Sequence, residues 1–159
     1  MGRTAEASRV TASTELLIGD TGGHHVLVRA LSRSHPHLFD YWDGNWIRSE
    51  VEVVAGGMRA AFHADFRAEE FQAFLDEAEA LSRSLDGIAT FSTMEGQLVV
   101  SLTGDPTGRL RVGGEALDAP GSANRLQFAF EIDQTYLSQI CRSLEVLLAA
   151  FPVIGAAEA

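Results

Sequence analysis

The sequence contains a small set of residues with the side chains of a metal site. His35 and His37 are two residues apart, so in an extended segment both imidazoles would point the same way, with Asp40 close by as a third ligand. Pro36 between the histidines disturbs that geometry, and no further histidine or cysteine cluster completes the set. His24 and His25 are adjacent and would point to opposite faces of a strand. The pattern favours a polar loop, and we expect no metal.

Paired carboxylates and a single cysteine are the other candidates for catalysis. Glu50 and Glu52 share one face of an expected strand, but in a chain so rich in acids such pairs arise by chance, and a solvated face is the better interpretation. Cys141 lies on the apolar stripe of the last expected helix, where a buried structural thiol is favoured. The sequence has no GxSxG elbow and no phosphate-binding GxxxxGK[ST] loop. We therefore expect no catalytic residues, no cofactor and no enzyme activity.

Acidic side chains are concentrated between Asp40 and Asp86. Eleven of the 22 acidic residues lie there, with only four arginines, and the formal net charge of the 159-residue chain is −10. A phosphate backbone would be repelled by most of this surface, so direct nucleic-acid binding is not expected. The negative electrostatic potential of this surface favours a cationic partner, although many soluble bacterial proteins are acidic only because net charge keeps them soluble.

The YWDGNW segment (Tyr41 to Trp46) opens this acidic region and has two interpretations. Structurally, Asp43-Gly44 can form a tight turn while Tyr41, Trp42 and Trp46 pack over a sheet edge. Functionally, tyrosine and tryptophan often anchor interfaces, and here they stand beside acidic side chains. The segment would then receive a basic protein surface or line a small-ligand pocket.

Hydrophobic periodicity predicts the elements that position these residues. Alternation indicates a hairpin over residues 15–30 and a second around the Gly56–Gly57 turn, followed by an amphipathic helix that Asp65 or a neighbour caps and Gly87 ends. A second block of strands up to Ile132 precedes a helix over residues 136–148. The fold class is α+β, with a mostly antiparallel sheet of eight or nine strands and two main helices. The similar order of the two halves indicates either a strand-strand-helix duplication or a coincidence.

The expected organisation is a flexible N-terminus (1–13), one α+β domain (14–155) and a flexible tail (156–159). One cysteine cannot form an internal disulfide, which suits a reducing cytoplasm. No apolar run has the length of a membrane span, and the N-terminus has no apolar core of a signal peptide. We expect a cytoplasmic protein that does not contact a membrane.

Several motifs together resemble those of a family of small bacterial proteins that includes WapI-like immunity proteins. The resemblance spans roughly residues 14–155. The motifs that carry it are YWDGNW, Gly56–Gly57, the acidic helix with Phe71, Phe74 and Leu75, FEIDQTYL (Phe130 to Leu137) and Phe151-Pro152. The resemblance implies a non-enzymatic cytoplasmic protein that binds and neutralises the toxic domain of a cognate toxin, often a nuclease.

A nuclease needs a basic active site, which an acidic protein can occupy by imitating the charge of nucleic acid. The alternative is a small-ligand-binding protein or an unrecognised enzyme with a pocket near Tyr41–Trp46, and a third interpretation is a homo-oligomeric structural protein. The sequence does not identify the partner or the oligomeric state. The candidate partner-binding residues are Asp40, Tyr41, Trp42, Asp43, Asn45, Trp46, Glu50, Glu52, Glu69, Glu70 and Glu77.

Overall fold

The computed structural model describes residues 14–157; the expected N-terminal segment 1–13 and the last two residues of the expected tail lie outside the described residues. The first half contains β1 (Glu15–Gly19), β2 (His25–Arg33), α2 (Tyr41–Gly44), β3 (Trp46–Ala55), β4 (Met58–Arg67) and α3 (Ala68–Ser84). The second half contains β5 (Ile88–Phe91), β6 (Leu98–Gly104), β7 (Arg109–Leu117), β8 (Arg125–Asp133) and α4 (Tyr136–Ala150).

The α+β class, the antiparallel pairing and the two long helices are confirmed. The described residues contain eight strands, and these form two four-stranded sheets, each in sequence order and each followed by a long helix. Every neighbouring pair of strands is antiparallel. The similar order of the two halves of the sequence therefore corresponds to a repeated arrangement of four strands and one helix.

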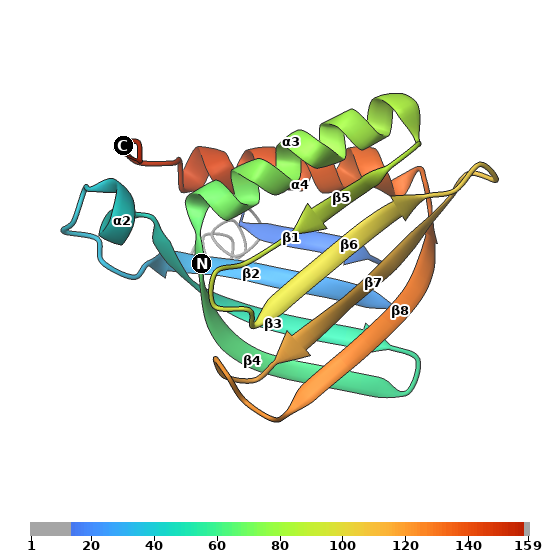
Figure 1. Ribbon diagram of the computed structural model, residues 1–159, viewed down its shortest axis with the longest axis horizontal. Coiled ribbons are helices and arrows are strands. Elements are labelled where there is room, and N and C mark those ends of the chain that lie inside the picture. Colours follow the sequence, from blue (N-terminus) through green and yellow to red (C-terminus); the bar gives the residue numbers. More distant parts are fainter. Residues whose placement is uncertain (1–13, 158–159) are drawn as a thin grey trace, which may run out of the picture.

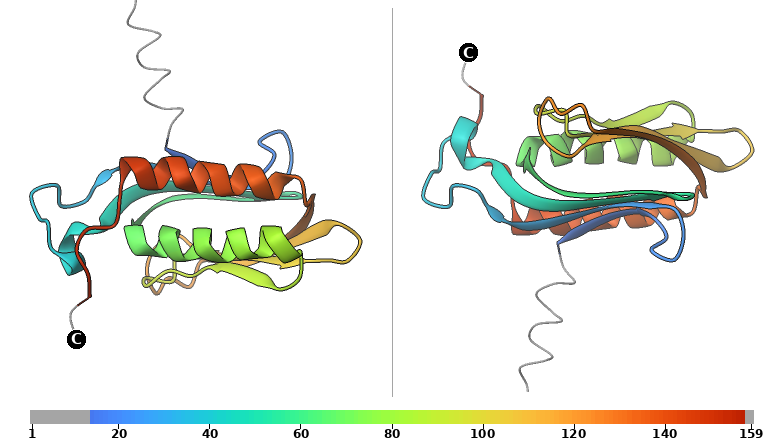
Figure 2. Two further views of the ribbon diagram at one scale, coloured as in Figure 1. Left: turned by 90° about the horizontal axis from the view of Figure 1, so that it is seen from above. Right: turned by 90° about the horizontal axis from the view of Figure 1, so that it is seen from below.

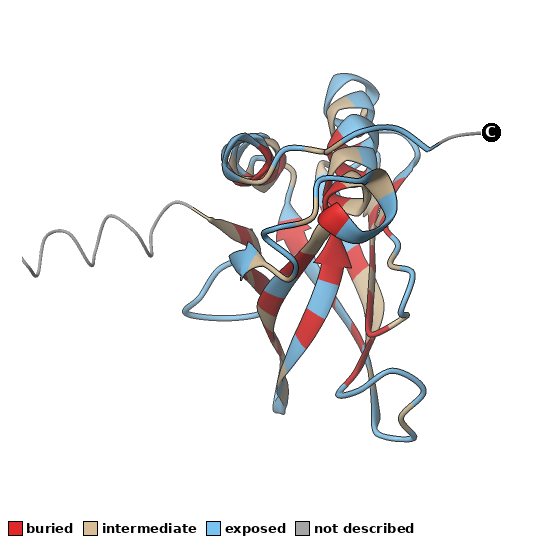
Figure 3. Cartoon of the chain, turned by 90° about the vertical axis from the view of Figure 1, so that its left-hand side faces the viewer, coloured by how far each residue is buried: buried red, intermediate tan, exposed pale blue. Residues whose placement is uncertain are grey.

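The two sheets face each other, and both long helices lie side by side along one edge of the pair (Figures 1 and 2). Helix α4 packs on β1, while α3 packs on β5 and on α4. Alternate residues of each strand point between the sheets, as in the register Leu16–Val28–Val51, and are buried there (Figure 3). Burying one such side chain contributes about 1.5 to 3 kcal/mol. The buried side chains of both sheets and both long helices belong to one continuous core.

The predicted ends of the first long helix were wrong. Asp65 lies inside β4, because that strand continues to Arg67, which pairs with Trp46 and occupies the N-cap position of α3. At the other end the C-cap is Leu85, in the left-handed conformation with φ of 56°; Gly87, which also has a positive φ of 121°, lies two residues beyond the cap. Leu85 packs against the core, and its backbone lies so close to Gly104 that any side chain there would collide with it. Packing fixes the end of this helix.

No helix among residues 14–157 is both long and apolar enough to cross a membrane.

Candidate functional site

Residues 34–46, the connection from β2 to β3 together with the first residue of β3, form a lobe that projects from one end of the molecule (Figures 1 and 2). We call it the α2 lobe. Its centre is one helical turn rather than the predicted tight turn: the Asp40 carboxylate caps it by accepting from the Asp43 backbone N–H at 3.0 Å. Gly44 is required for close approach, since a Cβ there would lie 2.8 Å from the carbonyl oxygen of Leu38.

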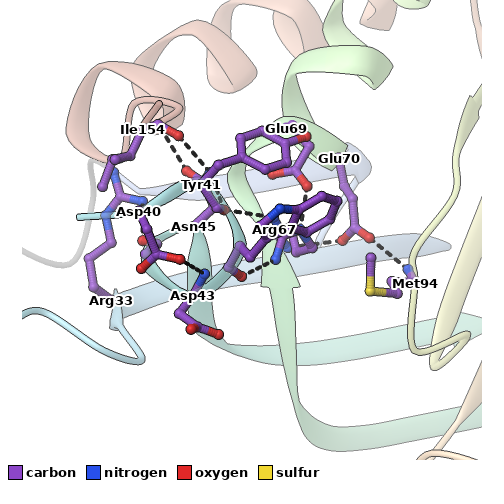
Figure 4. A network of polar contacts seen from close by, with 12 residues as sticks. Arg33, Asp40, Tyr41, Asp43, Asn45, Arg67, Glu69, Glu70, Met94 and Ile154 are labelled. Atoms are coloured by element: carbon purple, nitrogen blue, oxygen red, sulfur yellow. Dashed lines mark hydrogen bonds and ion pairs between the residues drawn. The ribbon is translucent and has the colours of Figure 1, made fainter. Parts of the chain in front are cut away.

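Three aromatic rings of the lobe lie around a buried arginine, Arg67, which Figure 4 shows close to Tyr41. Arg67 is only 1% exposed, and its guanidinium carbon lies 5.2, 5.4 and 5.0 Å from the ring centroids of Tyr41, Trp42 and Trp46. It also donates to the backbone carbonyls of Tyr41 and Trp42 and pairs with the Glu69 carboxylate. Cation–π contacts in a desolvated site are worth roughly 0.5 to 2 kcal/mol. Arg67 thus fixes the lobe to the junction of β4 and α3.

A second set of contacts fixes the lobe to the C-terminal segment. Asn45 is fully buried; its Nδ2 donates to the carbonyls of Tyr41 (2.9 Å) and Ile154 (3.0 Å), and its Oδ1 accepts from the Ile154 N–H at 2.8 Å. Arg33 donates to the carbonyls of Gly44 and Pro152. Two networks that meet at the Tyr41 carbonyl therefore hold the backbone of a short, projecting helix.

The outer face of the lobe is apolar and acidic. Phe39 is 75% exposed and Trp42 is 55% exposed, although Trp42 also contacts Arg67. Asp40 and Asp43 are exposed beside them. Exposed aromatic side chains are enriched at the centres of protein-binding surfaces, and the rims of such surfaces are polar.

The three candidate acids of helix α3 are used inside the fold. Glu69 pairs with Arg67, and its second oxygen is buried without a hydrogen-bond partner. Glu70 accepts from the backbone N–H groups of Arg67 (2.9 Å) and Met94 (2.6 Å), and burial raises the pKa of its carboxyl. Glu77 accepts from the N–H of Thr90 in β5 at 2.8 Å. Glu77 therefore binds the edge strand β5 to the helix, and Glu70 binds the β5–β6 loop to it.

Glu50 and Glu52 lie further along β3, on the sheet face that points away from the core. Glu50 pairs with Arg29 at 3.2 Å, and Glu52 pairs with Arg59 at 2.6 Å. The hydrogen bond from His25 lowers the pKa of Glu52, with a smaller contribution from Arg59. The eleven sequence candidates thus fall into two groups: those in or under the α2 lobe, and acids elsewhere that already have internal partners.

A cleft of about 690 Å³ lies beside the lobe, where the first sheet meets the loops of the second. Its wall includes Trp46 and His35 of the lobe and, opposite them, Glu95 and Pro120. His35, His37 and Asp40 do not come together as ligands: within residues 14–157 no three histidine, cysteine or acidic side chains are placed to hold a metal ion.

Arg67, the residue that organises the site, was not among the residues predicted from the sequence. The signal was present in the hairpin: counting outward equally from Gly56 and Gly57 reaches Trp46 on one strand and Arg67 on the other, and these two do pair. The exposed Phe39 was also missed, because a single phenylalanine beside Leu38 looks like ordinary core.

Three comparisons relate the chain to known proteins. The model of the immunity protein WapI-like family matches residues 16–152. A comparison with curated proteins gave no match. Among solved structures, Trypanosoma brucei MRP1/MRP2 is similar with a TM-score of 0.50 and 12% identity, covering 94% of this chain and 92% of that chain.

Two further structures are more distant. A guide-RNA-binding protein complex bound to a guide RNA has a TM-score of 0.49 and 12% identity, covering 91% of this chain and 94% of that chain. The CdiA-CT/CdiI toxin and immunity complex from Enterobacter cloacae has a TM-score of 0.40 and 6% identity, covering 62% and 88%. At these identities the MRP1/MRP2 match shows a shared fold alone.

Proposed function

The chain belongs to the immunity protein WapI-like family, and we propose that it binds and neutralises a cognate toxin domain through the outer face of the α2 lobe. The binding centre consists of Phe39 and Trp42, with Asp40 and Asp43 at its rim. Neutralisation by binding is non-enzymatic and takes place in the cytoplasm.

The observation that carries this proposal is that Trp42 is both exposed and held in place. Its ring covers the guanidinium of Arg67, and its backbone carbonyl accepts from the same group. An aromatic side chain that is ordered before binding loses little conformational entropy when a partner covers it. Such preordered aromatic residues are the ones that contribute most to protein–protein affinity.

The remaining lobe candidates act beneath this surface. Tyr41, Asn45 and Trp46 support the helical turn, and Glu69 and Glu70 hold Arg67 and the base of α3. Glu50, Glu52 and Glu77 contribute to the negative field rather than to direct contact, because each already has a partner in the fold.

The charge of the chain indicates the kind of toxin. A net charge of −10 attracts a basic protein surface and repels nucleic acid itself. A nuclease toxin has a basic active site because it must bind phosphate, so a nuclease-like domain is the partner we propose. Its association should be fast at low salt and slower at high salt.

Growth protection tests the proposal. Toxin domains encoded beside the gene are expressed with the wild-type chain, with a Phe39→Ala/Trp42→Ala double variant, or with Ile88→Ala, which removes an equally exposed apolar side chain far along the molecule in β5. We expect the wild type and Ile88→Ala to protect cells from one of these toxins and the double variant to fail while keeping the wild-type circular dichroism. Full protection by the double variant would exclude the lobe as the binding surface.

A further inference from the structure

The cleft beside the α2 lobe has its own polar chemistry. It is lined by the start of β3 and the end of β4 on one side and by the β5–β6 and β7–β8 loops on the other. At about 690 Å³ it lies within the range of ligand-binding clefts and holds more than one side chain. Since Trp46 belongs both to this wall and to the rings around Arg67, the cleft is continuous with the lobe.

Gln97 contributes a side-chain amide to this wall. The residue is only 4% exposed, and its Nε2 donates to the carbonyls of His63 (3.2 Å) and Leu117 (3.3 Å). These two bonds fix the orientation of the amide group. No donor within residues 14–157 bonds to the side-chain oxygen Oε1, and this oxygen is accessible to solvent. An amide oxygen that is oriented by the fold, reachable from the cleft and without a protein donor can accept from a ligand that carries N–H groups.

The other polar groups of the cleft indicate the charge of that ligand. Asp65 and Glu95 contribute two carboxylates, against one guanidinium from Arg48. Arg48 is opposite Asp65 in the β3–β4 pairing, but no ion pair joins these two described residues. An anionic ligand would face two carboxylates and the Gln97 oxygen, whereas a cation with several donors can satisfy all three.

From this geometry we infer that the cleft receives an arginine side chain of the toxin domain. Arginine fits better than lysine because its planar guanidinium has five N–H donors and can also pack on an aromatic ring, and Trp46 is an aromatic residue of the cleft wall. This inference rests on the proposed function, because it names one side chain of the toxin domain that would bind beside the aromatic residues of the α2 lobe. The lobe would supply apolar contact and the cleft a specific charged contact.

The test uses a probe in place of the toxin. N-acetyl-arginine amide is titrated into the full chain while NMR follows the Trp46 indole and Gln97 side-chain amide signals, with N-acetyl-citrulline amide as the uncharged probe of the same shape. We expect saturable shifts of both signals with arginine, at millimolar affinity, and none with citrulline. Equal binding of both probes, or no shift with arginine, would overturn the inference.

Variants that remove single charges test whether the carboxylates of the cleft attract the arginine probe. Glu95→Gln, in an exposed loop, should weaken arginine binding about threefold to tenfold, whereas Asp86→Asn, an exposed acid outside the cleft, should not change it. Arg48→Gln should strengthen binding, because it removes the competing guanidinium. If Arg48→Gln weakened binding, Arg48 would not compete with the bound guanidinium, and the inference would be wrong.

Failure of this inference is distinguishable from failure of the proposed function. A chain that protects cells through Phe39 and Trp42 but does not bind the arginine probe contradicts the cleft assignment alone. A chain that binds the probe but protects equally well without Phe39 and Trp42 contradicts the assignment of the lobe.

Discussion

Replacing Arg67 with methionine tests whether this residue supports the α2 lobe. Methionine fills much of the same space but leaves the Glu69 carboxylate without its cation and the Trp42 carbonyl without its donor. Removing one partner of a buried ion pair costs about 3 to 5 kcal/mol. Glu69 retains some exposure and can turn toward water, and methionine keeps favourable contact with the rings, so we expect about 3 kcal/mol.

Urea denaturation measures this loss. A destabilisation of 3 kcal/mol corresponds to a fall in Tm of about 6 to 12 °C for a chain of this size. Hydrogen exchange should also become faster across residues 41–46, because the lobe loses a main attachment. Arg59→Met is the matched control: Arg59 forms an exposed ion pair with Glu52, so its loss should cost less than about 1 kcal/mol.

A double variant separates the ion pair from the packing. Arg67→Met/Glu69→Gln should recover about 1 to 2 kcal/mol of the loss, because it removes the unpaired charge. If Arg67→Met cost no more than Arg59→Met and left exchange in the lobe unchanged, Arg67 would not be the support that the geometry indicates.

Three further outcomes follow from single positions. Gly44→Ala places a methyl group 2.8 Å from the Leu38 carbonyl oxygen, so we expect a loss of about 1 to 3 kcal/mol in urea denaturation. Burial raises the pKa of Glu70 above its ordinary 4.5. As pH rises through 4.5 the unfolded chain loses this proton before the folded chain does, so the ionisation of Glu70 lowers the free energy of unfolding. When the pH is raised from about 4 to 7, the urea midpoint should therefore fall less for Glu70→Gln than for the wild type. Burial raises the pKa of the Cys141 thiol, so iodoacetamide should alkylate it more slowly in the native chain than in urea.

The strands and the two long helices could be predicted because their patterns are local. Leu16 and Ile18 alternate with other residues in β1, and Phe71, Phe74 and Leu75 repeat at helical spacing in α3; both patterns correspond to buried faces. The helix ends were less predictable. Arg67 caps α3 because β4 extends to meet Trp46, and the sequence near Asp65 contains a more conventional cap.

The roles of the acidic residues depended on contacts between distant segments. The sequence predicts a first-turn position for Glu70 and a solvated one for Glu77, but Met94 and Thr90 of the second half bring backbone N–H groups to them. A local pattern has no information about that contact. For the same reason the charge of the segment from Asp40 to Asp86 overstates how many acids are free for a partner.

The two interpretations of YWDGNW correspond to two faces of the same lobe. Tyr41 and Trp46 pack around Arg67, as the structural interpretation required, although on a buried arginine rather than over an apolar sheet edge. Trp42 contributes to both, since its ring contacts Arg67 and remains more than half exposed. Exposure of this ring could not be derived from residue types alone.

The most direct test of the central claim is the affinity of the purified chain for the toxin domain against which it protects. Calorimetry compares wild type, Trp42→Ala and Ile88→Ala at two salt concentrations. We predict that Trp42→Ala weakens binding by at least about 2 kcal/mol, roughly thirtyfold, while Ile88→Ala changes it little and high salt weakens it for all three. Wild-type affinity in Trp42→Ala would show that the toxin binds elsewhere and would contradict the assignment of the α2 lobe.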